Sequence, residues 1–398
     1  MASFIRHRRQ PLLAMLAALV LVLTACGSDD TTAPDPSDNG SDAPQDEPLE
    51  PVVIRFVGDF PPPPFNTAVS MEWFRDEIES RIPGSEVRLF FAGQLYNTGA
   101  EALEALASGN LELNYGQFGK DAPFEPAHGV ISQPASLTTV GAIAKVGESE
   151  YGQFLAERMA ALGVTTLATA STSFFLGYAG KCPHPATPDD LRGLNVRTFE
   201  PVILPNVLPL WGANPIAMAF ADVPSALETG VLDGIFTSVG GWLAVREQVP
   251  CYTSFGVGAS GQDPYNITAS SAWLDGLNAA TRAVVVDTVR EMADISLHLT
   301  WCEDMRQVER LGTDDLTQPG FLIHPPEVTE IFFGPDLLGT RVIEALETAV
   351  GPEVAPFVSQ WFEEARQLSE ENPPGSSKYE QDDCGPYVEM LEASAARN

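Results

Sequence analysis

Basic residues are scarce in this chain of 398 amino acids. It has 22 Lys and Arg side chains against 54 Asp and Glu, a formal net charge of −32. The first 25 residues contain three arginines and no acid, so the remainder has 19 basic against 54 acidic side chains and a net charge of −35. A surface this negative argues against nucleic acid and anionic lipid as partners. A small organic anion would need a local, bidentate cation in order to bind.

Sequence motifs of common enzymes are also absent. The chain contains no Gly-x-Ser-x-Gly, no His-Glu-x-x-His and no P-loop. The histidines at 128, 184, 298 and 324 have no partner at a suggestive spacing, and no Cys-x-x-Cys occurs. We therefore expect neither an enzyme nor a metal or other cofactor. A catalytic triad assembled from residues far apart in the sequence stays open.

Only five cysteines are present. One of them, Cys26, lies at the end of the leader described below, which leaves four in the rest of the chain. An even number in an exported protein predicts two disulfides, and four cysteines allow three pairings. We expect Cys182–Cys251, which flank the central segment described below, and Cys302–Cys384, which would tie a late helix to the C-terminal tail.

The N-terminus carries the pattern of a lipoprotein signal peptide over residues 1–25. Arg6, Arg8 and Arg9 precede an apolar run over residues 12–23, and Leu-Thr-Ala-Cys then reads as a lipobox with Cys26 lipidated. The apolar run is short for a membrane span, although an ordinary signal peptide or a membrane anchor stays an alternative. Residues 26–50 lack large apolar side chains except Leu49 and predict a disordered acidic tether. We expect an extracytoplasmic protein of the cell envelope, anchored to the membrane by lipid.

The remaining chain is longer than a single hydrophobic core usually supports, so two lobes are expected. A β-branched strand pattern over residues 52–57 precedes an amphipathic helix pattern, and residues 105–112 (ALASGNLE) have the same form as residues 226–233 (ALETGVLD). Each is a helix end, a glycine stop and a strand start with an acid at the same offset, which indicates equivalent units of two similar α/β lobes. Open α/β sheets bind ligands beyond the carboxyl ends of their strands, so two facing lobes predict a cleft.

The segment from Leu191 to Trp242 carries the most specific pattern. A short strand with Arg197 is followed by a Trp-Gly-Ala-Asn-Pro break, and a helix then begins at Asp222 and stops at Gly230. The runs GLNVRTFEP and WGANPIAMAFADVPSALETGVLDG resemble the solute-binding proteins of TRAP (tripartite ATP-independent periplasmic) transporters, because several fixed spacings agree at once. The resemblance extends over roughly residues 51–365.

This resemblance implies a two-lobed periplasmic-binding-protein-like fold, each lobe a sheet flanked by helices, with crossing strands and a long helix linking the lobes. We place lobe I at residues 51–165 and 258–299, and lobe II at 166–257 and 300–398. The family likeness also implies that Arg197 clamps a ligand carboxylate between the lobes, with an ion pair to Glu200 or Asp233 as the structural alternative. The implied partners are a small-molecule organic acid and TRAP permease membrane subunits, and we expect a monomer.

Departures from the family pattern concern the ligand. Lys181 is the only cation between Arg158 and Arg192, where dicarboxylate binders of the family often have a second Arg, and Thr237 replaces a common Asn. A monocarboxylate with an apolar or aromatic part fits this pattern better than a small dicarboxylate. The further candidate contacts, each with a purely structural role as the alternative, are Gln117, Lys120, Phe60, Phe174 and Trp242. A sensor that docks on a receptor instead of a permease is the competing function.

Overall fold

The computed structural model describes residues 47–131, 133, 136–198, 207–258, 264–334 and 340–397. Residues 46–398 form one compact unit. The predicted signal peptide, Cys26 and most of the predicted tether lie outside the described residues. None of the helices in the described part combines the length and the apolar character needed to cross a membrane.

The first sheet has five strands in the order β2-β1-β3-β10-β4. Their bounds are β1 Val53–Gly58, β2 Glu86–Phe91, β3 Leu113–Gln117, β4 Val164–Ser171 and β10 Pro264–Ser270. Strand β1 runs parallel to β2 and β3, whereas β10 is antiparallel to both of its neighbours. The helices between these strands are α1 Asn66–Arg81, α2 Gly99–Ala107, α3 Phe118–Asp121, α4 His128–Ile131, α5 Val140–Ala144 and α6 Glu150–Ala161.

The second sheet has six strands in the order β11-β9-β5-β8-β6-β7. Their bounds are β5 Gly177–Gly180, β6 Asn195–Thr198, β7 Asn214–Ala217, β8 Gly234–Thr237, β9 Cys251–Ser254 and β11 Gly320–Ile323. The accompanying helices include α8 Val223–Glu228, α9 Val239–Val245 and α12 Pro326–Phe333. Strand β6 lies between β7 and β8 and is parallel to both, so the side chains at its end have main-chain groups on either side.

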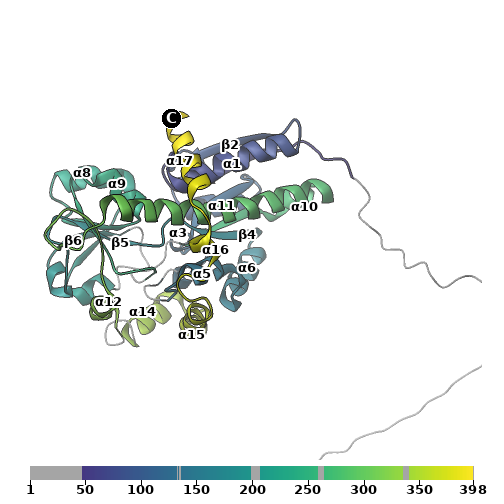
Figure 1. Cartoon of the computed structure of the whole chain (residues 1–398). Coiled ribbons are helices and arrows are strands. Elements are labelled where there is room, and N and C mark those ends of the chain that lie inside the picture. The colour runs from purple at the N-terminus through teal and green to yellow at the C-terminus, as the bar shows by residue number, and fades with distance from the viewer. Residues whose placement is uncertain are drawn as a thin grey trace, which may run out of the picture. The chain divides into compact units, whose positions relative to one another are not determined.

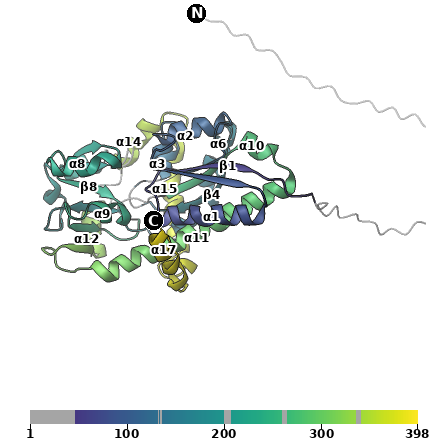
Figure 2. The same cartoon turned by 90° about the horizontal axis from the view of Figure 1, so that it is seen from above.

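Two sheets with their own helices confirm the predicted two-lobed α/β fold, and the chain crosses between them more than once (Figure 1). The long helix α11, Ala279–Leu311, is capped by Asn278, whose side chain accepts a hydrogen bond from the backbone N–H of Thr281. It packs against α1 and β4 of the first lobe and reaches β11 of the second. Figure 2 shows α11 passing from the side of β1 and β4 towards that of α9 and α12.

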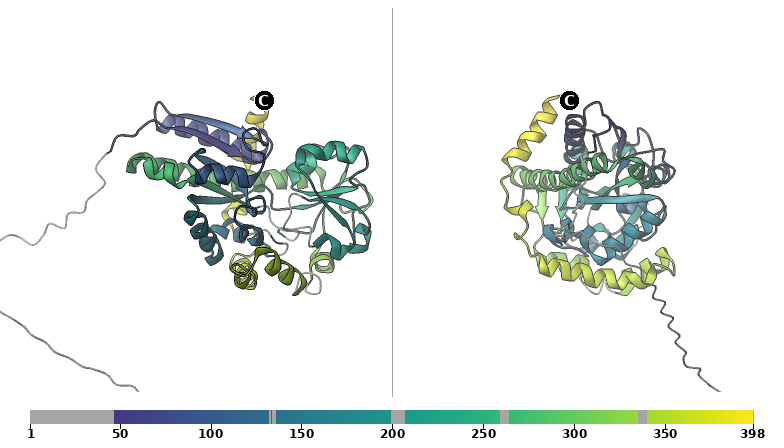
Figure 3. Two further views of the ribbon diagram at one scale, coloured as in Figure 1. Left: turned by 180° about the vertical axis from the view of Figure 1, so that it is seen from behind. Right: turned by 90° about the vertical axis from the view of Figure 1, so that its right-hand side faces the viewer.

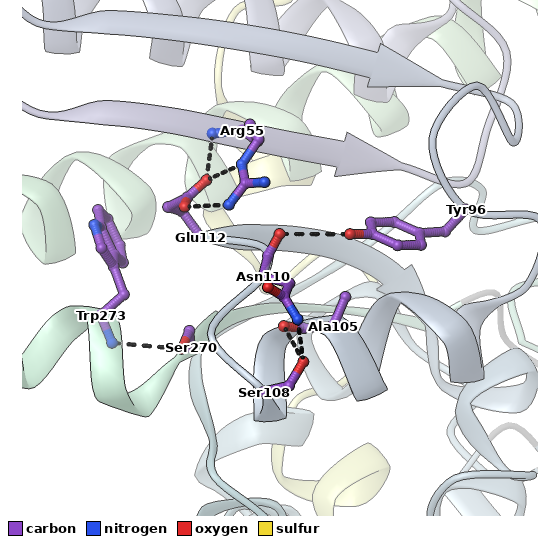
Figure 4. Close-up of polar contacts among 8 residues, drawn as sticks. All are labelled: Arg55, Tyr96, Ala105, Ser108, Asn110, Glu112, Ser270 and Trp273. Carbon is purple, nitrogen blue, oxygen red and sulfur yellow. Dashed lines mark hydrogen bonds and ion pairs between the residues drawn. The ribbon is translucent and has the colours of Figure 1, made fainter.

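The predicted internal repeat is present in the geometry. In both copies a helix ends at a left-handed glycine, with φ of +73° at Gly109 and +74° at Gly230. The next amide bonds back to the helix in the same way, from Asn110 to the Ala105 carbonyl and from Val231 to the Ala226 carbonyl. This is the hydrogen-bond pattern of a Schellman helix end, and Figure 4 shows the copy in the first lobe. The same helix-ending motif therefore leads from a helix into a strand in both lobes.

The last helices of the chain pack against helices of the first lobe, whereas the predicted boundaries assign them to the second. These helices are α14 Thr340–Val350, α15 Ala355–Glu371, α16 Lys378–Gln381 and α17 Gly385–Arg397, with α10 Ser271–Gly276 preceding α11. We expected residues 300–398 in the second lobe, but α15 contacts α4, α5 and α6, and α17 contacts α1 and α11, on the outside of the molecule (Figure 3). Leu391 packs with Val69 and Leu299 in a small apolar cluster. This cluster and a disulfide hold the tail against first-lobe helices.

Both expected disulfides are formed. Cys182 and Cys251 are joined with their Cα atoms 5.3 Å apart, and Cys302 and Cys384 with theirs 5.4 Å apart. The first bond fastens the loop after β5 to the start of β9, within the second lobe. The second joins α11 to the residue before α17. Both pairings predicted from the cysteine positions are therefore confirmed in the structure.

Candidate functional site

The ends of strands from both sheets meet at a small cavity of about 80 Å³. Gln117 ends β3 and Thr237 ends β8, whereas Arg197 is the third residue of β6 and Tyr265 the second of β10. The remaining lining comes from the loop after β1, from α3, from the residue after β4, from the turn before α8 and from the start of α9. The lining residues are Asp59, Phe60, Pro61, Phe65, Gln117, Lys120, Thr172, Arg197, Phe220, Thr237, Ser238, Gly241 and Tyr265. This is the position at which α/β sheets bind ligands.

A larger cavity of about 400 Å³ adjoins the first. The residues common to both linings are Asp59, Phe60, Pro61, Lys120, Arg197 and Phe220. The larger cavity extends past the loop after β2 on one side and past Met218 to Ala221 on the other. The two cavities together, hereafter the cleft, reach the few hundred Å³ that small-molecule sites usually enclose.

Arg197 is held in the cleft wall by main-chain groups. Its Nε donates to the Met218 carbonyl at 3.0 Å, and its Nη1 donates to the Phe236 carbonyl at 3.3 Å. Met218 follows β7 and Phe236 belongs to β8, the two neighbours of β6, so the position of β6 in the sheet determines where the guanidinium points. The residue is only 4% exposed. A guanidinium fixed in this way is well suited to bidentate contact with a carboxylate.

Aromatic rings line the cleft near Arg197 and form what is called the aromatic wall below. The guanidinium lies 5.6 Å from the centre of the Phe220 ring, a cation–π contact. Across the cleft, Phe60 stacks on Phe65 with 5.9 Å between ring centres and contacts Tyr265 at 5.7 Å. These rings come from both lobes. The wall can cover the apolar part of a ligand while Arg197 holds its charge.

The first lobe contributes an ion pair. The Nζ of Lys120 lies 3.1 Å from Oδ2 of Asp59, and the two side chains are 24% and 17% exposed. The Lys120 ammonium also donates to the Asp59 carbonyl at 3.4 Å. Both residues line both cavities, as Arg197 does. Cations from the two lobes therefore face the same space.

The two lobes are in contact beside the small cavity. Gly240, the second residue of α9, lies against Phe65 at the start of α1, and a Cβ at position 240 would come 2.6 Å from a ring carbon of Phe65. Similarly, a Cβ at Gly241 would come 2.0 Å from Oγ1 of Thr237. Because neither glycine has a side chain, α9 can approach both the cleft and the opposite lobe closely.

The described residues offer no site for a metal, since no three His, Cys, Asp or Glu side chains come together there. The run Gly256-x-Gly258-x-x-Gly261 has the spacing of dinucleotide-binding loops. It connects β9 with β10, however, whereas such a loop must lead from a strand into a helix. The context therefore gives no support for nucleotide binding.

Residues 62–312 match the family model described as bacterial extracellular solute-binding protein, family 7. The chain belongs to this family. The resemblance to TRAP solute-binding proteins is thereby confirmed, and it extends to relatives and to solved structures of TRAP periplasmic solute-binding proteins.

Two curated relatives show how far the sequence likeness goes. The C4-dicarboxylate-binding periplasmic protein DctP of Rhodobacter capsulatus is 32% identical over 193 residues, which cover 46% of this chain and 55% of that protein. A solute-binding protein of Chromohalobacter salexigens is 26% identical over 174 residues, covering 44% and 51%. The matches therefore span about half the length of these relatives.

Two solved structures share the fold. A TRAP periplasmic solute-binding protein of Sulfitobacter, solved with β-D-galacturonate, superposes with a TM-score of 0.67 at 20% identity, covering 78% of this chain and 99% of that one. One of Shewanella oneidensis, solved with succinate, gives a TM-score of 0.66 at 21% identity, covering 79% and 100%. At identities this low, the likeness establishes the shared fold.

In this family 7 protein, five of the predicted ligand contacts lie together in the cleft: Arg197, Thr237, Gln117, Lys120 and Phe60. Two others do not line it. The ring of Phe174 packs 6.0 Å from Trp301 of α11, and Trp242 stacks on Tyr252 at 5.1 Å while its indole N–H donates to the Val249 carbonyl. Both are core residues, because the face of a short helix or crossing loop that an aromatic occupies cannot be read from the sequence.

Among the cleft residues that the sequence analysis did not name are Asp59, which pairs with Lys120, and Phe220, whose ring lies against Arg197. Asp59 directly follows the first strand, so its place at a strand end was a usable signal. Phe220 lies two residues after Met218 in a segment without regular periodicity. Its position under Arg197 depends on how the turn between β7 and α8 folds, which residue spacing does not specify.

Proposed function

We propose that this chain binds an organic acid in the cleft between its lobes, with the ligand carboxylate held by Arg197. The observation that carries the proposal is a buried guanidinium, oriented by two carbonyl groups, in a cavity that both lobes line. In a protein of net charge −32, such a fixed local cation is what an anionic ligand needs. Thr237, Gln117, Lys120 and Phe60 complete the contacts.

The ligand is a carboxylate with an apolar part. Phe60, Phe65, Phe220 and Tyr265 line the small cavity and offer ring faces to an apolar surface. Relatives and structural neighbours of the family support an acidic ligand, since their names mention C4-dicarboxylates, uronates and succinate. The aromatic wall favours the larger of these ligand types, a ring or chain with an apolar face.

Membership of the family supports delivery of the ligand to membrane permease subunits of a TRAP-type transporter. Ligand contacts made to both lobes at once would stabilise the closed form of the protein. Lipidation at Cys26, outside the described residues, would keep the protein at the membrane, with residues 26–50 as a tether. The chain then acts as a non-catalytic carrier.

The test is native mass spectrometry of residues 51–398 produced in an exporting host, followed by a thermal-shift screen against mono- and dicarboxylates. A co-purified acid, or an acid that raises the melting temperature, supports binding. Arg197→Ala should abolish the shift, and Arg197→Lys should restore little of it because Lys lacks the bidentate geometry. Arg192→Ala is the matched control, because Arg192 is exposed on the same lobe and pairs with Asp189. Unchanged affinity in Arg197→Ala, or shifts with neutral solutes alone, would refute the proposal.

A further inference from the structure

The cleft contains an acidic side chain although its proposed ligand is an anion. Among the described residues that line the two cavities, Asp59, Lys120 and Arg197 are the charged ones. A ligand with one carboxylate can place it against Arg197, whereas a second carboxylate would bring a further negative charge close to Asp59, in a space from which water is largely displaced.

Lys120 is not available as a second carboxylate receptor. Its ammonium group lies 3.1 Å from Oδ2 of Asp59 and also donates to the Asp59 carbonyl at 3.4 Å. The backbone N–H of Gln117 donates to the same Oδ2 at 3.4 Å. A second carboxylate would have to compete with Asp59 for Lys120 while lying close to the Asp59 charge. Like charges at such distances disfavour one another, and the effect is stronger where solvent is scarce.

The other oxygen of Asp59 indicates which group can lie there instead. Oδ1 is buried and has no hydrogen-bond partner among the described residues. A buried carboxylate oxygen without a donor is unfavourable, and a ligand hydroxyl that reaches it removes that cost. The part of the cleft next to Asp59 thus favours hydrogen-bond donors over anions.

We propose that the Asp59–Lys120 pair makes the cleft selective for ligands that carry a single carboxylate and present hydroxyl groups, not a second carboxylate, to the first lobe. The inference rests on the proposed function, because it takes Arg197 as the receptor of the one carboxylate. It adds Asp59 as a residue that repels a second ligand carboxylate, and repulsion of this kind is a common way in which binding sites reject close analogues.

The experiment measures dissociation constants by titration calorimetry for matched pairs that differ by one carboxylate. The pairs are D-gluconate with D-glucarate, butyrate with succinate, and 3-phenylpropionate with phenylsuccinate. Wild-type protein should bind the monocarboxylate of a responding pair at least about tenfold more tightly, a difference of about 1.4 kcal/mol. Asp59→Asn should reduce or reverse that preference by strengthening dicarboxylate binding. Lys120→Met should weaken both members of the pair and increase the preference.

Asp275→Asn is the charge-matched control, because Asp275 lies on the surface in a pair with Arg282. It should leave the preference unchanged, and thermal melts of all variants establish that they fold. A wild-type preference for dicarboxylates, or an unchanged preference in Asp59→Asn, would overturn the inference while leaving the proposed function intact. Binding of no acid at all, or binding that survives Arg197→Ala, would instead contradict the proposed function itself.

Discussion

Glu112 accepts a hydrogen bond from the backbone N–H of Arg55 at 2.8 Å, and its carboxylate also binds the Arg55 guanidinium (Figure 4). The equivalent acid of the second lobe, Asp233, accepts from the backbone N–H of Asn195 at 2.8 Å. In both lobes an acid placed three residues after the glycine stop binds the neighbouring parallel strand. This contact fixes how far the two parallel strands are shifted along one another. It thereby fixes where the other end of the neighbouring strand meets the cleft.

Substitution of Glu112 should therefore destabilise the first lobe. Glu112→Ala removes the acceptor of a backbone amide and of a guanidinium, and such charge-assisted bonds contribute about 1–3 kcal/mol. Urea unfolding should show a loss of unfolding free energy towards the lower end of that range, because the Arg55 side chain is 37% exposed and solvent weakens its ion pair. Glu86→Ala is the control, since Glu86 pairs with Arg88 on the surface and should change the free energy of unfolding little. Equal effects of the two substitutions would contradict this role of Glu112.

The sequence predicted the parts of the fold that depend on local rules. The two glycine stops rest on backbone conformation and the two disulfides on the number and positions of the cysteines, and all of them appear in the structure. Placement of the tail was wrong because it depends on contacts such as Leu391 against Val69, more than 300 residues apart in sequence. Arg197 was found in the cleft because a strand position fixes its direction. Trp242 was expected in the cleft but packs in the core, because residue spacing in a short helix does not determine which way a side chain points.

The pH dependence of stability should reveal the titration of the buried Asp304 carboxyl group. This acid of α11 accepts hydrogen bonds from Ser173 Oγ at 3.1 Å and the Phe174 amide at 2.8 Å, and thus holds the crossing between β4 and β5. Burial, with a smaller contribution from Glu303, raises its pKa to about 8. A raised folded-state pKa means that the folded protein keeps a proton that the unfolded chain loses. The associated stability is complete below about pH 4 and is lost as the pH rises through about 8.

Asp304→Asn mimics the protonated acid and keeps an acceptor oxygen for the crossing loop. Its free energy of unfolding, measured from pH 4 to 9, should fall less steeply than that of the wild type, by a few kcal/mol over the range. Above pH 8 the variant should be the more stable protein. Parallel curves for the two proteins would show that Asp304 does not titrate in this range.

Closure of the lobes should depend on the absence of a side chain at Gly240. In Gly240→Ala the new methyl group would lie 2.6 Å from a Phe65 ring carbon, so the two lobes cannot approach as closely. Ligand binding should weaken about tenfold, equivalent to about 1.4 kcal/mol, and small-angle scattering with ligand should show a more open form. Gly276→Ala is the matched control, because a Cβ there meets nothing within 4 Å. Normal affinity and normal closure in Gly240→Ala would exclude a role for this contact.

The disulfide between Cys302 and Cys384 should determine how firmly the tail is held. It closes a segment of 82 residues, and loops of this size contribute about 2–5 kcal/mol when cross-linked. The double variant Cys302→Ser and Cys384→Ser should therefore melt at a lower temperature, and amide exchange should increase first in α17. Alkylation of the denatured, unreduced wild-type protein should modify none of Cys182, Cys251, Cys302 and Cys384. A labelled thiol would contradict the pairing. An unchanged exchange rate in α17 would show that its non-covalent contacts, the apolar cluster and the polar contacts of Ser394 and Arg397 with Glu72, hold the helix without the disulfide.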